Sequence, residues 1–249
     1  MKKSLYWALS ILGGLMLLFG LLSCLASKPL PQGRTGSEAD ALAQKMLSAI
    51  NATAWDSTGA ISWSFVGQNQ YLWDRERSYL QANWGNYRVL VNLSNQKGLA
   101  FKKGEKLETA ETEKLVKKAY ERWINDSFWL QAPAKVFASG TSRTLIESED
   151  GKVGLLITYS SGGVTPGDSY LWELDAAEKP QAWRMWVSVL PIKGMRATWE
   201  NWQTLSTGAK IATTHKMGPV TLRVENLRGA RHLEDLLNGA PDPFIELMK

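Results

Sequence analysis

Large apolar residues alternate with polar residues over much of the chain, and this period of two predicts strands with one buried face. In residues 61–65 (ISWSF) serines separate isoleucine, tryptophan and phenylalanine, and residues 170–174 (YLWEL) place large side chains on every second position. A polar, proline-containing break follows, and the alternation resumes over residues 183–189 (WRMWVSV). The stretch from 170 to 189 therefore predicts a hairpin with one large aromatic face.

A helical period replaces the period of two at three places. The first predicted helix begins near Ser37, which resembles an N-cap, and continues for about three turns. The second is predicted from Glu111 to Ile124, and a short third one from Leu233 to Asn238.

The remaining segments favour one antiparallel meander over parallel β-α-β units. About ten or eleven strands are separated by glycine- and proline-containing turns at roughly ten-residue intervals. An open antiparallel sheet of that width curls, and its concave face then needs a cover. We therefore expect a mainly β (α+β) protein, a curled antiparallel half-barrel with helices covering the concave face.

The first 24 residues have the composition of a bacterial export signal. Lys2 and Lys3 precede an uncharged, largely apolar run over residues 5–22, and Ser23 stands directly before Cys24. The sequence LLSC resembles the lipobox, in which the cysteine is lipidated and becomes the first mature residue. The expected division of the chain is a signal peptide over residues 1–23, a flexible linker over 24–36 after the lipidated cysteine, and a single domain over 37–249.

The apolar run has a second interpretation, because about 18 apolar residues can also cross a bilayer as an uncleaved anchor. Both interpretations keep the N-terminal lysines inside and place the remainder of the chain outside the cytoplasm. Leu25 stands where lipoproteins retained at the inner membrane of enteric bacteria carry an aspartate. We therefore expect a periplasm-facing, membrane-anchored protein of the bacterial cell envelope, and of the outer membrane in particular.

Composition argues against several classes of function. The net charge of +5 is mild and no run of Lys or Arg is longer than a pair, so the chain predicts no nucleic-acid partner. Cys24 is the only cysteine, which leaves none for a disulfide. The two histidines, His215 and His232, lack metal-site spacing, and no Gly-x-Ser-x-Gly motif occurs. We therefore expect no cofactor, no metal and no enzymatic activity. An envelope hydrolase would need a cleft where a histidine meets a carboxylate.

The tryptophans suggest a ligand cavity. The chain has 12 of them, and most belong to predicted strands. Filled cores use mainly Leu, Ile and Val, whereas indole rings form broad, rigid walls that each carry one N–H group. The residues expected to line the cavity are Trp63, Phe65, Tyr170, Trp172, Trp183 and Met185. The alternative is that the rings fill a β core and hold no ligand.

The order of these features resembles the superfamily of the bacterial lipoprotein carrier LolA and its lipidated outer-membrane receptor LolB, which includes the lipid-binding lipoproteins LppX and LprG. The resemblance spans residues 38–225 and includes the segments FWLQAPAKVFASGTSRTLI (128–146) and YLWELDAAEKPQAWRMWV (170–187). It implies an incomplete barrel with a helical lid over an apolar cavity for acyl chains. An arginine helps to latch the lid in the carrier, and no arginine here can be matched to it.

Two functions follow. The first is a monomer, anchored to the membrane, that binds or transfers a lipid or an acylated protein. The second is an envelope scaffold or accessory subunit that binds a protein partner through its outer surface and holds no ligand. Phe128, Trp129 and Leu130 are the nearest candidate for an exposed tip that touches the membrane or a partner, although the simpler interpretation tucks them under the sheet.

Overall fold

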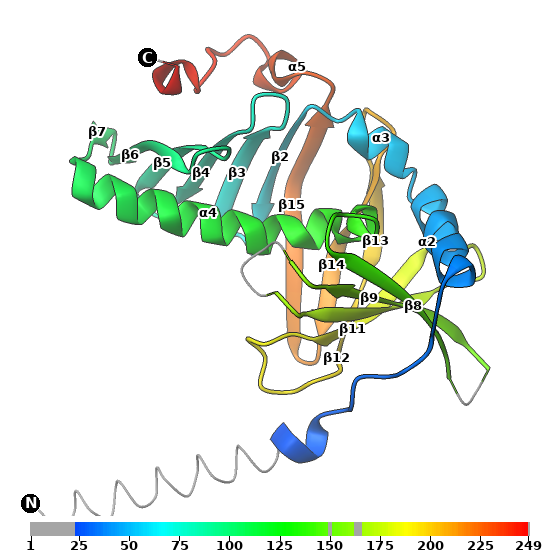
Figure 1. The fold of residues 1–249 in the computed structure, drawn as a ribbon. Coiled ribbons are helices and arrows are strands. Elements are labelled where there is room, and N and C mark those ends of the chain that lie inside the picture. Colours follow the sequence, from blue (N-terminus) through cyan, green and yellow to red (C-terminus); the bar gives the residue numbers. More distant parts are fainter. Residues whose placement is uncertain (1–22, 149–150, 162–165, 249) are drawn as a thin grey trace, which may run out of the picture.

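The computed structural model describes residues 23–148, 151–161 and 166–248. Within these residues, antiparallel strands form two open sheets of six and nine strands, and a few helices accompany them (Figure 1). This confirms the expected mainly β class with helices beside curled antiparallel sheet. The strands number fifteen in the described part of the chain rather than ten or eleven, because short edge strands and one interrupted strand add to the count.

The nine-stranded sheet has the strand order β13-β14-β15-β2-β3-β4-β5-β6-β7. Its strands are β2 (Ala60–Phe65), β3 (Asn69–Asp74), β4 (Tyr79–Trp84), β5 (Tyr87–Asn92), β6 (Lys97–Lys102), β7 (Glu105–Lys106), β13 (Glu200–Thr204), β14 (Lys210–Met217) and β15 (Val220–Ala230). Consecutive hairpins join β2 to β7. The long β15 then pairs with β2, so that Val224 faces Phe65 and Ala230 faces Ala60. Both ends of the domain therefore build this sheet.

The six-stranded sheet has the order β1-β8-β9-β10-β11-β12. Its strands are β1 (Arg34–Thr35), β8 (Thr141–Glu147), β9 (Val153–Tyr159), β10 (Ser169–Leu174), β11 (Pro180–Trp186) and β12 (Met195–Thr198). Trp199 is the single residue between β12 and β13, so the chain passes from one sheet to the other at this tryptophan. Beside it, the Lys216 N–H of β14 donates to Thr198 Oγ1 at 3.0 Å. The two sheets therefore adjoin at Trp199.

Helices lie against both sheets. The longest, α4 (Thr109–Gln131), runs along one face of the nine-stranded sheet (Figure 1) and contacts β5, β6 and β14. α2 (Ser37–Ala49) packs against β8 and β9. The short helical segments are α3 (Ala52–Asp56), η1 (Ala132–Lys135), α5 (Leu233–Leu237) and η2 (Ile245–Leu247).

The helix α4 continues past the predicted end at Ile124. Buried positions recur at helical spacing from Val116 and Ala119 to Leu130, so burial of one stripe extends the helix through a stretch that local sequence suggested would end it. Pro133 then stands in the 3₁₀ turn that follows, where its missing N–H and fixed φ stop the α-helical hydrogen bonding.

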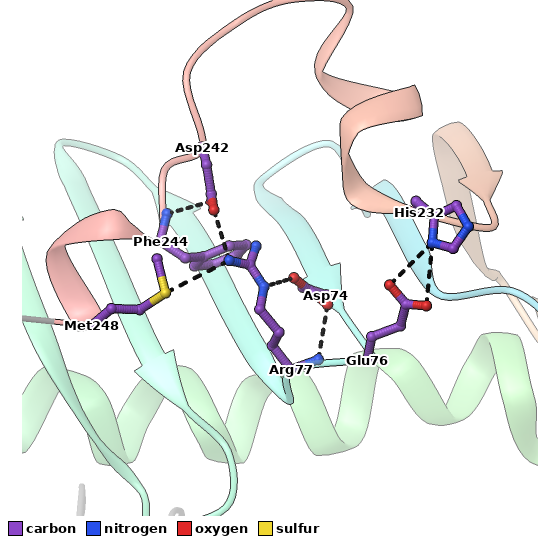
Figure 2. A network of polar contacts seen from close by, with 7 residues as sticks. All are labelled: Asp74, Glu76, Arg77, His232, Asp242, Phe244 and Met248. Carbon is purple, nitrogen blue, oxygen red and sulfur yellow. Dashed lines mark hydrogen bonds and ion pairs between the residues drawn. The ribbon is translucent and has the colours of Figure 1, made fainter.

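The nine-stranded sheet is covered on both faces, because the C-terminal segment packs on the side opposite α4. A second, smaller core forms there from Ala60, Leu90, Phe101, Ala230, Leu233, Leu236 and Phe244. Arg77 fastens this segment: its Nε lies 2.5 Å from Asp74 Oδ2 and its Nη1 lies 2.7 Å from Asp242 Oδ2 (Figure 2). The hydrogen bond to Asp242, followed by that to Asp74, raises the pKa of Arg77. Burial opposes ionisation of Asp242, but the bonds from Arg77 and the Phe244 N–H outweigh it and lower the pKa of Asp242.

Residues 24–36, expected to be a flexible linker, lie against the domain in the structure. The Lys28 N–H donates to the Lys193 carbonyl at 2.9 Å, and Arg34 and Thr35 pair with β8 as an edge strand. Cys24, the predicted lipidation site, is exposed. The described part of the chain contains no helix long and apolar enough to cross a membrane, and the predicted signal peptide up to residue 22 lies outside that part.

Candidate ligand-binding interior

The predicted aromatic hairpin is present as β10 and β11 of the six-stranded sheet. Trp172 lies opposite Trp183, and Tyr170 lies opposite Met185. All four side chains are buried in the main core. The hairpin therefore brings four of the six predicted cavity residues together.

Rings of this hairpin meet rings from α4, β9, β14 and the junction between the sheets. We call this group the aromatic cluster; its members are Phe128, Trp129, Tyr159, Tyr170, Trp172, Trp183, Trp199 and His215. The ring of Trp183 is central. Its centroid lies 4.6 Å from that of Tyr170 and 4.9 Å from those of Trp172 and Trp199. Trp129 reaches it from α4 at 5.0 Å, edge to face, a favoured geometry for aromatic pairs.

The other two predicted cavity residues, Trp63 and Phe65, lie on β2 of the nine-stranded sheet. Both are buried in the main core, and Trp63 stacks on Tyr71 with ring centroids 4.7 Å apart. Among the described residues, no ring contact joins this pair to the aromatic cluster. The alternation correctly predicted their burial, but the rings are divided between two sheets.

The predicted tip of Phe128, Trp129 and Leu130 lies inside the protein. Trp129 is 9% exposed and Leu130 is 3% exposed. Phe128 is half-buried and stacks on Trp183 with ring centroids 5.7 Å apart. The structure therefore agrees with the simpler interpretation, which tucks these residues under the sheet: α4 continues through them, and the rings of Phe128 and Trp129 meet that of Trp183 in the six-stranded sheet.

Three members of the aromatic cluster, Tyr159, Trp199 and His215, were not among the predicted site residues. Trp199 and His215 come together where the sheets adjoin, with ring centroids 4.5 Å apart. His215 also lies 4.9 Å from the ring of Trp129. The sequence places His215 at a strand end between a threonine and a lysine, which gave no sign of burial. Its position depends on the contact between β12 and β14, which no local pattern encodes.

The imidazole of His215 is fully buried and neutral. Burial lowers its pKa to about 4, against the opposing effect of the Thr198 carbonyl and the backbone of Trp129. Nδ1 lies 3.0 Å from the Thr198 carbonyl oxygen, and because a carbonyl can only accept, Nδ1 carries the proton. Nε2 then presents a lone pair, so in this tautomer it acts as a hydrogen-bond acceptor.

Several buried polar atoms have no hydrogen-bond partner among the described residues. They are Nε1 of Trp63, Trp123, Trp172, Trp183 and Trp199, Oη of Tyr159 and Nε2 of His215. Five of these seven atoms belong to the aromatic cluster. Buried polar groups in native proteins are almost always paired, and leaving one unpaired costs about 1–3 kcal/mol. The cluster therefore concentrates polar atoms that a bound molecule could satisfy.

The cluster is uncharged at neutral pH. Burial raises the pKa of Tyr159, and burial together with Asp168 raises the pKa of Tyr170, so both hydroxyls stay protonated. In the described chain no Lys or Arg lies over any of its rings, and no group of three His, Cys, Asp or Glu side chains could hold a metal ion. An apolar surface with unpaired polar atoms and no charge suits a neutral ligand.

A buried carboxylate ties α4 to β3 at one side of this interior. Asp126 of α4 accepts hydrogen bonds from Tyr71 Oη at 2.6 Å and from Asn69 Nδ2 at 2.8 Å. Burial, followed by the neighbouring Asp126 charge, raises the pKa of Tyr71, so the phenol remains the donor. Arg122, one turn earlier on α4, donates to Asn69 Oδ1 at 3.1 Å. Polar contacts therefore hold this part of the helix against β3.

Two surface pockets lie outside the aromatic cluster. One, of about 410 Å³, lies beside Trp73, Arg75 and Trp123; the other, of about 610 Å³, lies beside β13, β15 and α5. None of the predicted cavity residues lines either pocket.

Comparisons with known proteins assign no family. No family profile matches the chain, and no curated protein matches it. Among solved structures, a DUF1329 family protein from Desulfovibrio piger is similar with a TM-score of 0.39 and 10% sequence identity, over 86% of this chain and 100% of that one. A likeness of this size carries no argument about function.

Proposed function

We propose that this chain is a membrane-anchored protein of the bacterial envelope that binds the acyl chains of a lipid or of an acylated protein between α4 and the six-stranded sheet. The observation that carries the proposal is the set of unpaired polar atoms inside the aromatic cluster. A core that only needed filling would favour aliphatic side chains, which bring no N–H groups to satisfy.

The chemistry of the cluster indicates what kind of ligand it suits. The indole N–H groups of Trp172, Trp183 and Trp199 can donate to ester or amide carbonyl oxygens, whereas Nε2 of His215 can accept from a hydroxyl or an amide N–H. Acyl chains would take the place of some contacts among the rings. Their burial would stabilise the complex by about 25 cal/mol for each Å² of apolar surface removed from water. The absence of a cation over the described rings disfavours a phosphate or a carboxylate at this position. Diacylglycerol and acylated cysteine both fit.

Binding requires the second half of α4 to separate from the six-stranded sheet, because the rings of the cluster touch one another. The contact is made by the rings of Phe128 and Trp129. Beside these rings the helix also buries polar residues: within α4, Gln131 Nε2 donates to Ser127 Oγ at 3.1 Å. When a helix separates from its partner, its polar groups can form hydrogen bonds to water instead. Exposing them therefore costs less free energy than exposing an apolar face of the same size. We therefore assign α4 the role of the moving cover.

Native mass spectrometry of the delipidated full chain tests the proposal. The chain is mixed separately with a diacylglycerol, a triacylated cysteine peptide and a phosphatidylglycerol. We expect one-to-one adducts with the first two, and about fivefold weaker binding by Trp183→Phe because one donor is lost. Trp202→Phe is the matched control, since Trp202 Nε1 already donates to the Trp199 carbonyl at 3.1 Å. If none of the three acylated compounds forms an adduct, the proposal is overturned.

The close packing of the rings favours one alternative, an envelope scaffold that binds a protein partner on its outer surface and holds no ligand. In that case the cluster is a filled core, and its unpaired N–H groups point at neighbouring ring faces as weak hydrogen bonds. The same experiment distinguishes the two functions, because a scaffold forms no lipid adduct.

A further inference from the structure

The segment that follows Cys24 is fastened to the loop between β11 and β12. The Lys28 N–H donates to the Lys193 carbonyl at 2.9 Å, the Lys193 N–H donates to Ser27 Oγ at 3.0 Å, and Trp186 Nε1 donates to the Lys28 carbonyl at 2.8 Å. Ser27 in turn bonds through its N–H and its hydroxyl to the Ser23 carbonyl. Cys24 is therefore held within a few residues of the domain surface.

Gly194 makes this close approach feasible. Its φ of +75° lies in the left-handed region, and a Cβ on it would come within 2.9 Å of Lys28 Cβ. A larger residue would be strained there and would push the segment away. The contact is therefore built into the loop as well as into the segment.

The same region exposes large apolar side chains. Leu25 is 74% exposed and Val189, in the β11–β12 loop, is 73% exposed. They are the two most exposed large apolar residues of the described chain. Lys28 is exposed beside them, while Lys193 Nζ donates to the carbonyls of Val187 and Leu190 at 2.6 and 3.0 Å and so fixes the shape of the loop.

We infer that this face, formed by residues 23–28 and 187–194, lies on the surface of a lipid bilayer. The apolar run of residues 5–22 ends directly before it, so both a lipidated Cys24 and an uncleaved anchor bring the membrane to this face. Exposed apolar side chains with a neighbouring lysine are what an interfacial segment offers to anionic lipids. The face takes over the membrane contact that the sequence suggested for Phe128, Trp129 and Leu130.

The inference fixes the orientation of the ligand-binding interior. β11 carries Trp183 and runs directly into the loop, and the four residue-to-residue steps from Trp183 to Val187 span about 13 Å when extended. The aromatic cluster would then stand close above the headgroups, with the C-terminal end of the chain on the opposite side of the molecule (Figure 1). This orientation rests on the proposed anchoring of the chain and does not depend on lipid uptake.

Depth-dependent quenching tests the inference on the full chain, isolated from membranes and reconstituted in phosphatidylethanolamine–phosphatidylglycerol vesicles. A fluorophore is placed at Val189→Cys or, as the control, at Ile245→Cys, which is 46% exposed on η2 near the C-terminus. The unsubstituted chain, labelled in parallel, supplies the background of Cys24. We expect doxyl lipids to quench the fluorophore at position 189 about twofold, because interfacial residues enter roughly 5–10 Å, and to leave position 245 unchanged.

A second variant separates orientation from chance contact. Ser27→Ala combined with Trp186→Phe removes two of the fastening hydrogen bonds, and we expect it to lower the quenching at position 189 while the chain stays on the vesicles. Equal quenching at 189 and 245, or none at 189 in membrane-bound protein, would overturn the inference. So would full quenching in the double variant. Failure of lipid uptake with quenching intact would instead contradict only the proposed ligand.

Discussion

Buried His215 makes the stability of the protein depend on pH. In the folded state its pKa is about 4, whereas an exposed histidine has about 6.5. The unfolded chain therefore binds more protons between these values, and stability falls as the pH drops from about 6.5 to about 4. The full difference corresponds to about 3 kcal/mol, and the loss between pH 7 and pH 5 to about 2 kcal/mol, at about 1.4 kcal/mol for each pH unit.

Urea unfolding at pH 7 and pH 5 measures this loss. In His215→Gln, the difference between the two pH values should shrink by about 2 kcal/mol relative to the parent chain, because the variant has no group that titrates at this position. His232→Gln is the control: His232 is an exposed histidine that meets Glu76 at 3.3 Å, and its loss should change little. If His215→Gln keeps the pH dependence of the parent chain, the imidazole is not held neutral by burial, and the description of the aromatic cluster fails.

Three further outcomes follow from the same contacts. Trp183→Phe should change the free energy of unfolding by less than about 1 kcal/mol, because removal of an unpaired N–H offsets the lost packing. Trp202→Phe loses a hydrogen bond that is made in the folded protein and should destabilise more; chemical denaturation measures both variants. Tyr71→Phe should destabilise by roughly 1–3 kcal/mol and speed lipid uptake in a stopped-flow assay, since it loosens α4. Because the pKa of Asp242 is lowered, its stabilising contact is complete above about pH 4 and lost as the pH falls further. Hydrogen exchange should therefore show the C-terminal segment opening in acid. Arg77→Ala should weaken this dependence without abolishing it, because the Phe244 N–H still donates to Asp242.

Local patterns predicted the strands well and their partners poorly. The period of two placed a strand over residues 61–65, where β2 lies, and a hairpin where β10 and β11 pair. β12 and β13 are separated by Trp199 alone, because that residue carries the chain from one sheet into the other, and no local pattern marks this change of sheet. Which strand pairs with which across the chain, as in β15 with β2, depends on long-range burial that periodicity does not contain.

The residues of the site could be predicted only where neighbours in the sequence form the contact. Alternation correctly assigned Trp172 and Trp183 to one buried face, because both belong to one hairpin. His215 was missed, since its burial arises where β14 meets β12. Val189 was expected on the aromatic face, but β11 ends at Trp186 and the alternation beyond it belongs to an exposed loop.

The most direct test of the central claim is the ¹H–¹⁵N spectrum of the indole groups, recorded with and without an acylated ligand. We predict that the Nε1–H signals of Trp172, Trp183 and Trp199 move downfield when a diacylglycerol or an acylated cysteine peptide is added, since each N–H gains a carbonyl acceptor. The signals of Trp186 and Trp202, whose N–H groups already donate to backbone carbonyls, should stay in place. Unchanged signals from all three cluster tryptophans at saturating ligand would contradict the claim that this interior is a binding site.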